Sequence, residues 1–315
     1  MPDHGLNALA ALARAQFANL GAGALRGPDA AVLESACAAL LGRAQEPMEG
    51  YRQWPRCVEE LLARWAPPGE SEQTVQLRLN LLLLALIETL PDRLQHSELP
   101  APFAEEYRRS GTRILQRIAQ GRRWVHGLED DIFRKDLALL CLRMLPCVSH
   151  LVCRYSGVPR STLLLPRNLA SGASARVVFA LRGRLRPLIA NHVHPEMTDR
   201  FDPAGREACY RLVCLLLMHW PDSAGLVGAS WYYDGAVGDI SPHLAYLRKV
   251  PAEHGALFLD AGASSEARAN AIFGSKRRRA RVEDGSYQPR TVMMVWPRRA
   301  LLEHHPRQPA TRAIV

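Results

Sequence analysis

The chain reads Gly225-Leu226-Val227-Gly228-Ala229-Ser230-Trp231-Tyr232-Tyr233-Asp234 at the point that decides its fold class. Residues 226–233 are apolar, small or aromatic and form a run too short for a core helix, so we expect a buried β-strand there. Strand-like and helical segments then alternate as far as Trp296. This alternation predicts a β-α-β-α-β unit whose neighbouring strands are parallel and joined by right-handed crossovers.

The residues before this unit are predominantly helical in pattern. Apolar residues recur at helical spacing in successive segments: 6–20, 29–41, 54–65, 71–90, 103–120, 132–155, 175–191 and 207–220. A turn and a short strand candidate, 163–165, follow residue 156. We therefore predict an α+β or α/β protein with a helical N-terminal half packed on a smaller α/β half. The predicted ranges are a helical domain 1–155, an α/β domain 156–306 and a polar tail 307–315.

Composition narrows the class of protein. The chain has 315 residues, of which 48% are hydrophobic, and a formal net charge of +9. Its arginines are spread along the chain among acidic residues, so we expect no nucleic-acid partner. The longest apolar run falls short of the ~20 residues that a membrane helix needs. The seven cysteines contain no CxxC pair, and we expect reduced thiols in a cytoplasmic protein with no membrane partner.

Three motifs in the C-terminal half resemble those of an uncharacterised group of bacterial proteins. The group shares an HxHP stretch followed by three further motifs, which in this chain are Trp231-Tyr232-Tyr233-Asp234, residues 240–248 (ISPHLAYLR) and residues 295–299 (VWPRR). The resemblance covers roughly residues 130 to 300. It implies no activity and assigns no site residues.

The strand and helix order from Leu226 to Trp296 is also similar to the C-terminal half of the GNAT acyltransferase fold. That resemblance implies acyl transfer from an acyl-CoA or a carrier-protein thioester. GNAT enzymes hold the coenzyme A pyrophosphate on a glycine-rich loop and helix N-terminus. The loop after the predicted strand instead carries Asp234 and Asp239, whose charges would repel a pyrophosphate.

The stretch His192-Val193-His194-Pro195-Glu196 suggests a metal site. Extended backbone would point the His192 and His194 imidazoles to one side, as a two-ligand chelate requires. Glu196 or Asp234 would complete a two-histidine, one-carboxylate triad for Fe(II), with Asp199 and His243 as alternatives. The competing interpretation is that both histidines are ordinary residues near a helix end. His304 and His305, beside Pro306, are expected to be solvated.

The triad would make the protein a non-haem iron oxygenase or hydroxylase of a small, polar, carboxylate-bearing metabolite. Tyr232, Arg248, Lys276 and Arg278 are the expected substrate-binding residues, because arginine forks match carboxylates. No nucleotide cofactor is expected, since phosphate-loop and dinucleotide fingerprints are missing. Two alternatives stay open: a GNAT-like acyltransferase whose basic run 276–281 meets an acidic carrier protein, and a non-catalytic scaffold.

Overall fold

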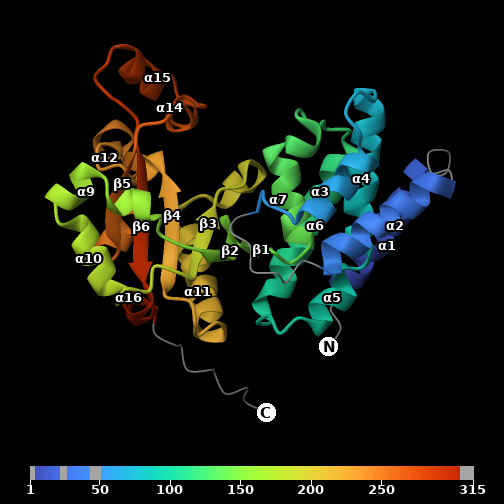
Figure 1. Ribbon diagram of the computed structural model, residues 1–315, viewed down its shortest axis with the longest axis horizontal. Helices are drawn as coiled ribbons and strands as arrows, with labels where there is room; N and C mark the ends of the chain where they lie inside the picture. The colour runs from blue at the N-terminus through green and yellow to red at the C-terminus, as the bar shows by residue number, and fades with distance from the viewer. Residues whose placement is uncertain (1–3, 22–26, 43–50, 306–315) are drawn as a thin grey trace. The chain divides into compact units, whose positions relative to one another are not determined.

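The computed structural model describes residues 4–21, 27–42 and 51–305 (Figure 1). The expected polar tail, 307–315, lies outside these residues. The chain divides into two compact units. Unit 1 comprises residues 1–153 and 193–198, and unit 2 comprises residues 154–192 and 199–315. The predicted fold class is confirmed: the N-terminal half is helical, and strands and helices mix in the C-terminal half.

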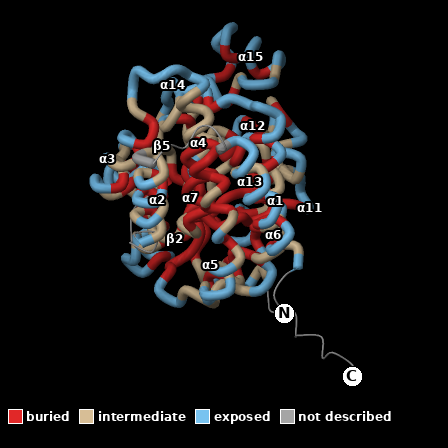
Figure 2. Tube along the Cα trace, turned by 90° about the vertical axis from the view of Figure 1, so that its right-hand side faces the viewer, coloured by how far each residue is buried: buried red, intermediate tan, exposed pale blue. Residues whose placement is uncertain are grey.

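Unit 1 is built from helices around one central helix. Its α-helices are α1 (His4–Gly21), α2 (Gly27–Gly42), α3 (Arg56–Trp65), α4 (Glu72–Glu88), α5 (Leu90–His96), α6 (Pro102–Ala119) and α7 (Asp131–Leu140), with a 3₁₀ turn η1 (Gly127–Glu129) before α7. Helix α4 contacts α1, α2, α5, α6 and α7. Residues 79–87 of α4 are apolar on nearly every side, which is typical of a helix enclosed by others. Figure 2 shows α4 and α7 as largely buried.

Unit 1 contains a hairpin that the sequence pattern does not reveal. The predicted helix over 132–155 is wrong beyond Leu140, where the chain forms β1 (Met144–Cys147) and the first part of β2 (His150–Ser156). The two strands pair antiparallel, with Cys147 opposite His150. The turn residue Val148 has φ of +57°, a conformation that β-branched residues rarely adopt. Packing, and not a turn motif of the Asn-Gly kind, forms this hairpin.

In unit 2, four strands of the six-stranded sheet lie side by side in the order β3-β4-β6-β5 (Figure 1). The strands are β3 (Leu188–His192), β4 (Gly225–Ser230), β5 (Leu257–Gly262) and β6 (Thr291–Pro297). Strands β3 and β4 are parallel and are joined by α11 (Pro203–His219). Strand β6 is antiparallel to both β4 and β5.

The predicted parallel pairing after residue 225 is therefore wrong. Strands β3 and β4 do pair in parallel, and β3 occupies residues that the pattern assigned to a helix over 175–191. The helix there is the shorter α10 (Ala173–Ala180). A five-residue apolar strand cannot be told from a helix end by periodicity alone, so the parallel pair was missed with it.

Further helices surround the sheet of unit 2. They are α8 (Arg160–Leu163), α9 (Pro166–Ala170), α10, α12 (Val237–Ile240), α13 (Tyr246–Glu253), α14 (Ser265–Ile272), α15 (Lys276–Glu283) and α16 (Arg298–His304), and short 3₁₀ turns are η3 (Trp231–Tyr233) and η4 (Pro242–Leu244). Helices α8, α9 and α10 contact β5, whereas α16 contacts β4, β6 and α11. The predicted strand over 163–165 is wrong, because Leu163 ends α8 and the next two residues form the turn before α9.

The basic run 276–281 starts a helix. The chain breaks between α14 and α15 at Gly274, whose φ of +66° suits glycine. Ser275 then caps α15, its hydroxyl accepting a hydrogen bond from the Arg278 amide at 3.3 Å. Lys276 and its neighbours thus occupy a first turn, where the helix dipole disfavours positive charge.

Among the described residues, no single helix has the length and apolar character of a membrane span. Helices α4 and α5 satisfy that test only as a pair, with a 45° bend between them.

Candidate functional site at the carboxyl ends of β3 and β4

The parallel strands of unit 2 pair over a short distance only. Ile189 lies opposite Leu226 and Ala190 opposite Val227. Strand β4 then continues for three residues to Ser230, while its other edge stays paired with β6. Ala229 is exposed and Ser230 is half-buried, which is unusual for residues in the middle of a sheet. The carboxyl ends of parallel strands are where α/β folds commonly bind ligands.

The Asn191 side chain lies across β4 where the ladder ends. In the amide orientation that satisfies both of its ends, Nδ2 donates to the Val227 carbonyl at 3.2 Å and Oδ1 accepts from Arg206 at 3.2 Å. A Cβ atom on Gly228 would lie 1.9 Å from the nearer polar atom of this amide. A side chain at position 228 would displace this amide. Glycine therefore allows the Asn191 side chain, and not the β3 backbone, to contact β4 at this point.

A buried arginine lies behind Asn191. Arg206, on α11, is 2% exposed, and its guanidinium donates to the hydroxyls of Tyr210 at 2.7 Å and Tyr233 at 3.0 Å. Burial raises the pKa of the Tyr210 hydroxyl, although the Arg206 charge opposes that shift. The Tyr210 hydroxyl therefore stays neutral, and both hydroxyls accept hydrogen bonds from the positively charged Arg206. This network holds α11, β3 and the end of β4 in one arrangement.

Helix α11 begins close to the same strand ends. The Asp202 carboxylate caps it by accepting a hydrogen bond from the Gly205 amide at 2.7 Å. Pro203 follows this cap as the first residue of the helix. Asn191, Arg206 and Gly228 were not predicted from the sequence. Their only sequence signals are an arginine near the start of a helix that is largely apolar in its second half and a glycine inside a strand.

Three of the residues predicted to bind metal or substrate, His192, Tyr232 and Asp234, lie near the ends of β3 and β4 in unit 2. His192 is the last residue of β3 and is half-buried. Tyr232 is buried within η3 and makes an edge contact with Phe201, their ring centroids being 5.7 Å apart. Burial raises the pKa of the Tyr232 hydroxyl well above its ordinary value. Asp234 follows η3, and its carboxylate accepts from the Ala236 amide at 3.1 Å.

The predicted carboxylate-binding arginines make contacts within the protein. Arg248 donates to the Tyr233 carbonyl and lies over the Phe258 ring at 4.0 Å. Arg278 donates to backbone carbonyls of unit 2, including Phe273 at 3.1 Å, and lies over the Trp231 ring at 4.7 Å. Lys276 is exposed at the start of α15. Their role in substrate binding remains a prediction.

His194 and Glu196 belong to unit 1 and lie among cations there. The His194 Nε2 atom is 3.2 Å from the Asp136 carboxylate, and both side chains are fully buried. The Glu196 carboxylate pairs with Arg113 at 2.9 Å and also with Arg117. Burial lowers the pKa of His194, and the Arg113 charge lowers it further. Burial would raise the pKa of Asp136, but Arg113 and His194 outweigh it and lower that pKa.

Comparison with known proteins identifies a similar fold. No family model matches the chain, and no curated protein matches it. A solved structure described as an acyltransferase in complex with decanoyl-CoA is similar to it, with a TM-score of 0.56 and 15% sequence identity. The match covers 87% of this chain and 81% of the other. At this identity the similarity shows a shared fold alone, and the resemblance to the uncharacterised bacterial group remains a prediction.

The expected Fe(II) cofactor is wrong. The solved structure with a similar fold is described as a complex with decanoyl-CoA, which is an acyl-CoA thioester. Local electrostatics agree, because a dication on Glu196 would meet the guanidinium groups that already pair with it. Among the described residues, the group of three side chains arranged as metal ligands is Glu207, His304 and His305. It includes none of the predicted ligands, which were His192, His194, Glu196 and Asp234.

Proposed function

We propose that the protein is an acyltransferase that takes its acyl group from a coenzyme A thioester. The observation that carries this proposal is the end of β4, where the ladder to β3 stops at Val227 and Ala229 is exposed. The similar acyltransferase structure with decanoyl-CoA supports the donor class. Coenzyme A contains an adenine nucleotide, so this proposal replaces the expectation that no nucleotide cofactor is used.

The open end of β4 suits the amide-bearing arm of coenzyme A. That arm is an extended chain with two amide groups, and extended amides bind to the edge of a strand through backbone hydrogen bonds. Asn191 ends the contact between β3 and β4 at Gly228, which leaves the later residues of β4 for such a ligand. The thioester carbonyl would then lie near Ser230 and η3.

Acyl transfer at this place needs few special groups. An amine or hydroxyl nucleophile attacks the thioester carbonyl, the C–S bond breaks, and the departing thiolate takes up a proton. Backbone amides fixed in a strand can stabilise the developing oxyanion. Tyr232 stays protonated at neutral pH and is the hydroxyl that we assign to the ligand-binding region, in agreement with its predicted place in the substrate site.

A binding experiment tests this proposal. Decanoyl-CoA is titrated into the full chain, and hydrolysis or transfer is followed by the thiol released in the presence of small amine acceptors. The Ala229→Trp variant places a large ring at the open end of β4 and should weaken decanoyl-CoA binding at least about tenfold, the equivalent of about 1.4 kcal/mol. The matched control is Ala236→Trp, at an exposed loop position of the same unit.

The outcomes are distinct. Saturable binding that Ala229→Trp weakens and Ala236→Trp leaves unchanged supports the proposal. A wild-type protein that neither binds decanoyl-CoA nor releases thiol from it contradicts the proposal. Equal binding by both tryptophan variants would show that the donor binds elsewhere.

A further inference from the structure

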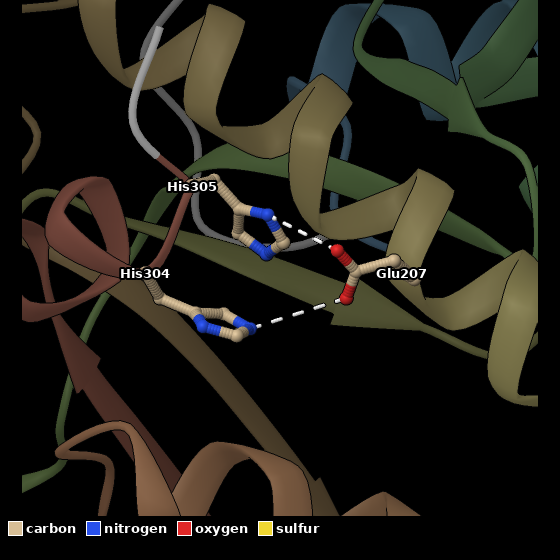
Figure 3. A group of neighbouring side chains, drawn as sticks. All are labelled: Glu207, His304 and His305. Carbon is tan, nitrogen blue, oxygen red and sulfur yellow. Dashed lines mark ion pairs between the residues drawn. The ribbon is translucent and has the colours of Figure 1, made fainter. Parts of the chain in front are cut away.

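Two adjacent histidines and a glutamate converge on one point of unit 2 (Figure 3). Glu207 projects from α11, and His304 and His305 come from the end of α16. His304 is the last helical residue, whereas His305 has φ of −116° and ψ of 70° and lies outside the helix. This change of backbone direction lets both rings face the same carboxylate, which consecutive residues within one helix cannot do. The expectation that these histidines are solvated is wrong, because their side chains are 15% and 8% exposed.

The separations match those of a tetrahedral metal site. The Nδ1 atom of His305 lies 3.3 Å from Glu207 Oε1, and the Nε2 atom of His304 lies 3.9 Å from Oε2. Zinc ligands lie about 2.0–2.2 Å from the ion, so two ligands of a tetrahedral site are roughly 3.3–3.5 Å apart. The ligand atoms of the three side chains lie within 4.8 Å of one another, so they would have to draw closer together to bind one ion.

Two further observations point to a ligand at this place. Among the described residues, the Nε2 atom of His304, which faces Glu207, is buried and has no hydrogen-bond partner. Buried polar atoms are normally satisfied, and a metal ion is one of the groups that satisfies them. The His304 ring also has a fixed orientation, because it stacks on His254 with ring centroids 3.6 Å apart and lies beside Trp296.

The charge state of the rings suits coordination, and one neighbour opposes it. Burial lowers the pKa of His305 to about 4 and also lowers the pKa of His304. Both imidazoles are therefore neutral at pH 7, as ligation requires. Arg211 lies 3.7 Å from Glu207 Oε1, and its charge disfavours a cation. The Arg211 side chain is 65% exposed, so it can move into solvent.

We propose that Glu207, His304 and His305 bind one zinc-like divalent ion and so fasten α16 to α11. Two nitrogens and one oxygen are a common protein ligand set for Zn²⁺, with a fourth position left for water. The site is independent of the acyl-CoA proposal, since it uses none of the residues at the end of β4.

The test is a Zn²⁺ titration of the tag-free full chain in competition with a chromophoric chelator. Co²⁺ as a second probe reports tetrahedral coordination by its visible absorption. Glu207→Gln and His305→Gln should each weaken Zn²⁺ binding at least about tenfold, since even groups that only orient metal ligands contribute 10–100-fold. His243→Gln, at an exposed histidine of the same unit, should leave binding unchanged.

Arg211→Gln gives a readout that damage to the fold cannot imitate. Removal of this charge should tighten Zn²⁺ binding several-fold, because the arginine competes with the ion for Glu207. Binding of one equivalent of Zn²⁺ that is weakened by Glu207→Gln and tightened by Arg211→Gln supports the site. No binding by the wild type, or binding that neither Glu207→Gln nor His305→Gln alters, overturns it.

Discussion

Gly228 is the residue on which the proposed donor site depends most directly. It lets the Asn191 amide contact β4, and this contact ends the pairing of β3 with β4. The sequence shows a glycine inside a strand, which suggests a close approach or a bulge. The identity of the approaching group could not be predicted, because Asn191 lies on a strand that the helical pattern obscured.

The Gly228→Ala variant should be less stable than the wild type. Its added methyl would lie 1.9 Å from the Asn191 amide, and overpacking of this kind costs about 1–3 kcal/mol. Urea unfolding measures the loss. The control is Gly235→Ala, where nothing lies near the added methyl. The cost of Gly228→Ala should fall when Asn191→Ala is also present, and an unchanged cost would show that the contact is not the cause.

His194 should make stability depend on pH between 7 and 5. Its pKa is lowered in the folded protein, so below about pH 6.5 the unfolded chain binds a proton that the folded chain does not. The free energy of unfolding therefore falls as pH decreases, by up to about 1.4 kcal/mol per pH unit for one proton. His304 and His305 contribute with the same sign. Asp136 does not contribute in this window, because its stabilisation is lost only near and below about pH 4.

The His194→Gln variant tests this assignment. Its free energy of unfolding should fall less steeply from pH 7 to pH 5 than that of the wild type. The difference between the two slopes should be at most that of one proton, about 1.4 kcal/mol per pH unit. His126→Gln is the control, because His126 is exposed. If the free energy of unfolding of His194→Gln falls as steeply with pH as that of the wild type, other groups cause the pH dependence.

At the scale of elements, helices with strong periodicity were predictable and short strands were not. Helix α4 was expected from Ser71 and is observed from Glu72, with Ser71 as its cap. Strand β3 and the β1–β2 hairpin lie in segments where apolar residues follow both helical and strand patterns. In such segments, pairing with other strands in the folded protein decides between helix and strand. A single sequence does not show which strand the partner will be.

Helix α15 should respond to the charge of its cap. Ser275→Ala removes the hydrogen bond to the Arg278 amide and should cost about 1 kcal/mol. Ser275→Asp keeps an acceptor and adds a negative charge beside a basic first turn, so it should stabilise the helix by about 0.3–1 kcal/mol. Urea unfolding of the two variants checks these signs.

A matched cap on α14 provides the control. Ser264 accepts a hydrogen bond from the Ala267 amide at 3.0 Å, but the first turn of α14 contains Glu266. Ser264→Asp should therefore gain less than Ser275→Asp. Equal gains at the two caps would contradict the role of the basic first turn.

At the scale of the whole molecule, fold class was predictable and chemistry was not. The metal prediction relied on two histidines close in sequence, His192 and His194. The structure assigns them to different units and surrounds Glu196 with arginines from α6. Residues that do converge, such as Glu207 and His305, lie about a hundred positions apart, so their spacing carries no signal in a single sequence.

The proposed donor site predicts where a ligand protects backbone amides. In hydrogen exchange with decanoyl-CoA, residues 228–233 of unit 2 should exchange more slowly, because the ligand would occupy the end of β4. Amides in the middle of α4 should be unaffected, since that helix is enclosed in unit 1. Protection confined to α4 and its neighbours would contradict this location.

Residues 193–198 complete unit 1 although unit 2 flanks them on both sides. During synthesis on the ribosome, the first 153 residues emerge without His194, which contacts the buried Asp136 carboxylate, and without Glu196, whose charge compensates Arg113 and Arg117. The helical unit can therefore reach its final state only after some forty residues of the other unit have been translated. A gene fragment that stops at residue 153 would encode a protein with uncompensated buried charges, so neither half can be excised as a simple contiguous piece.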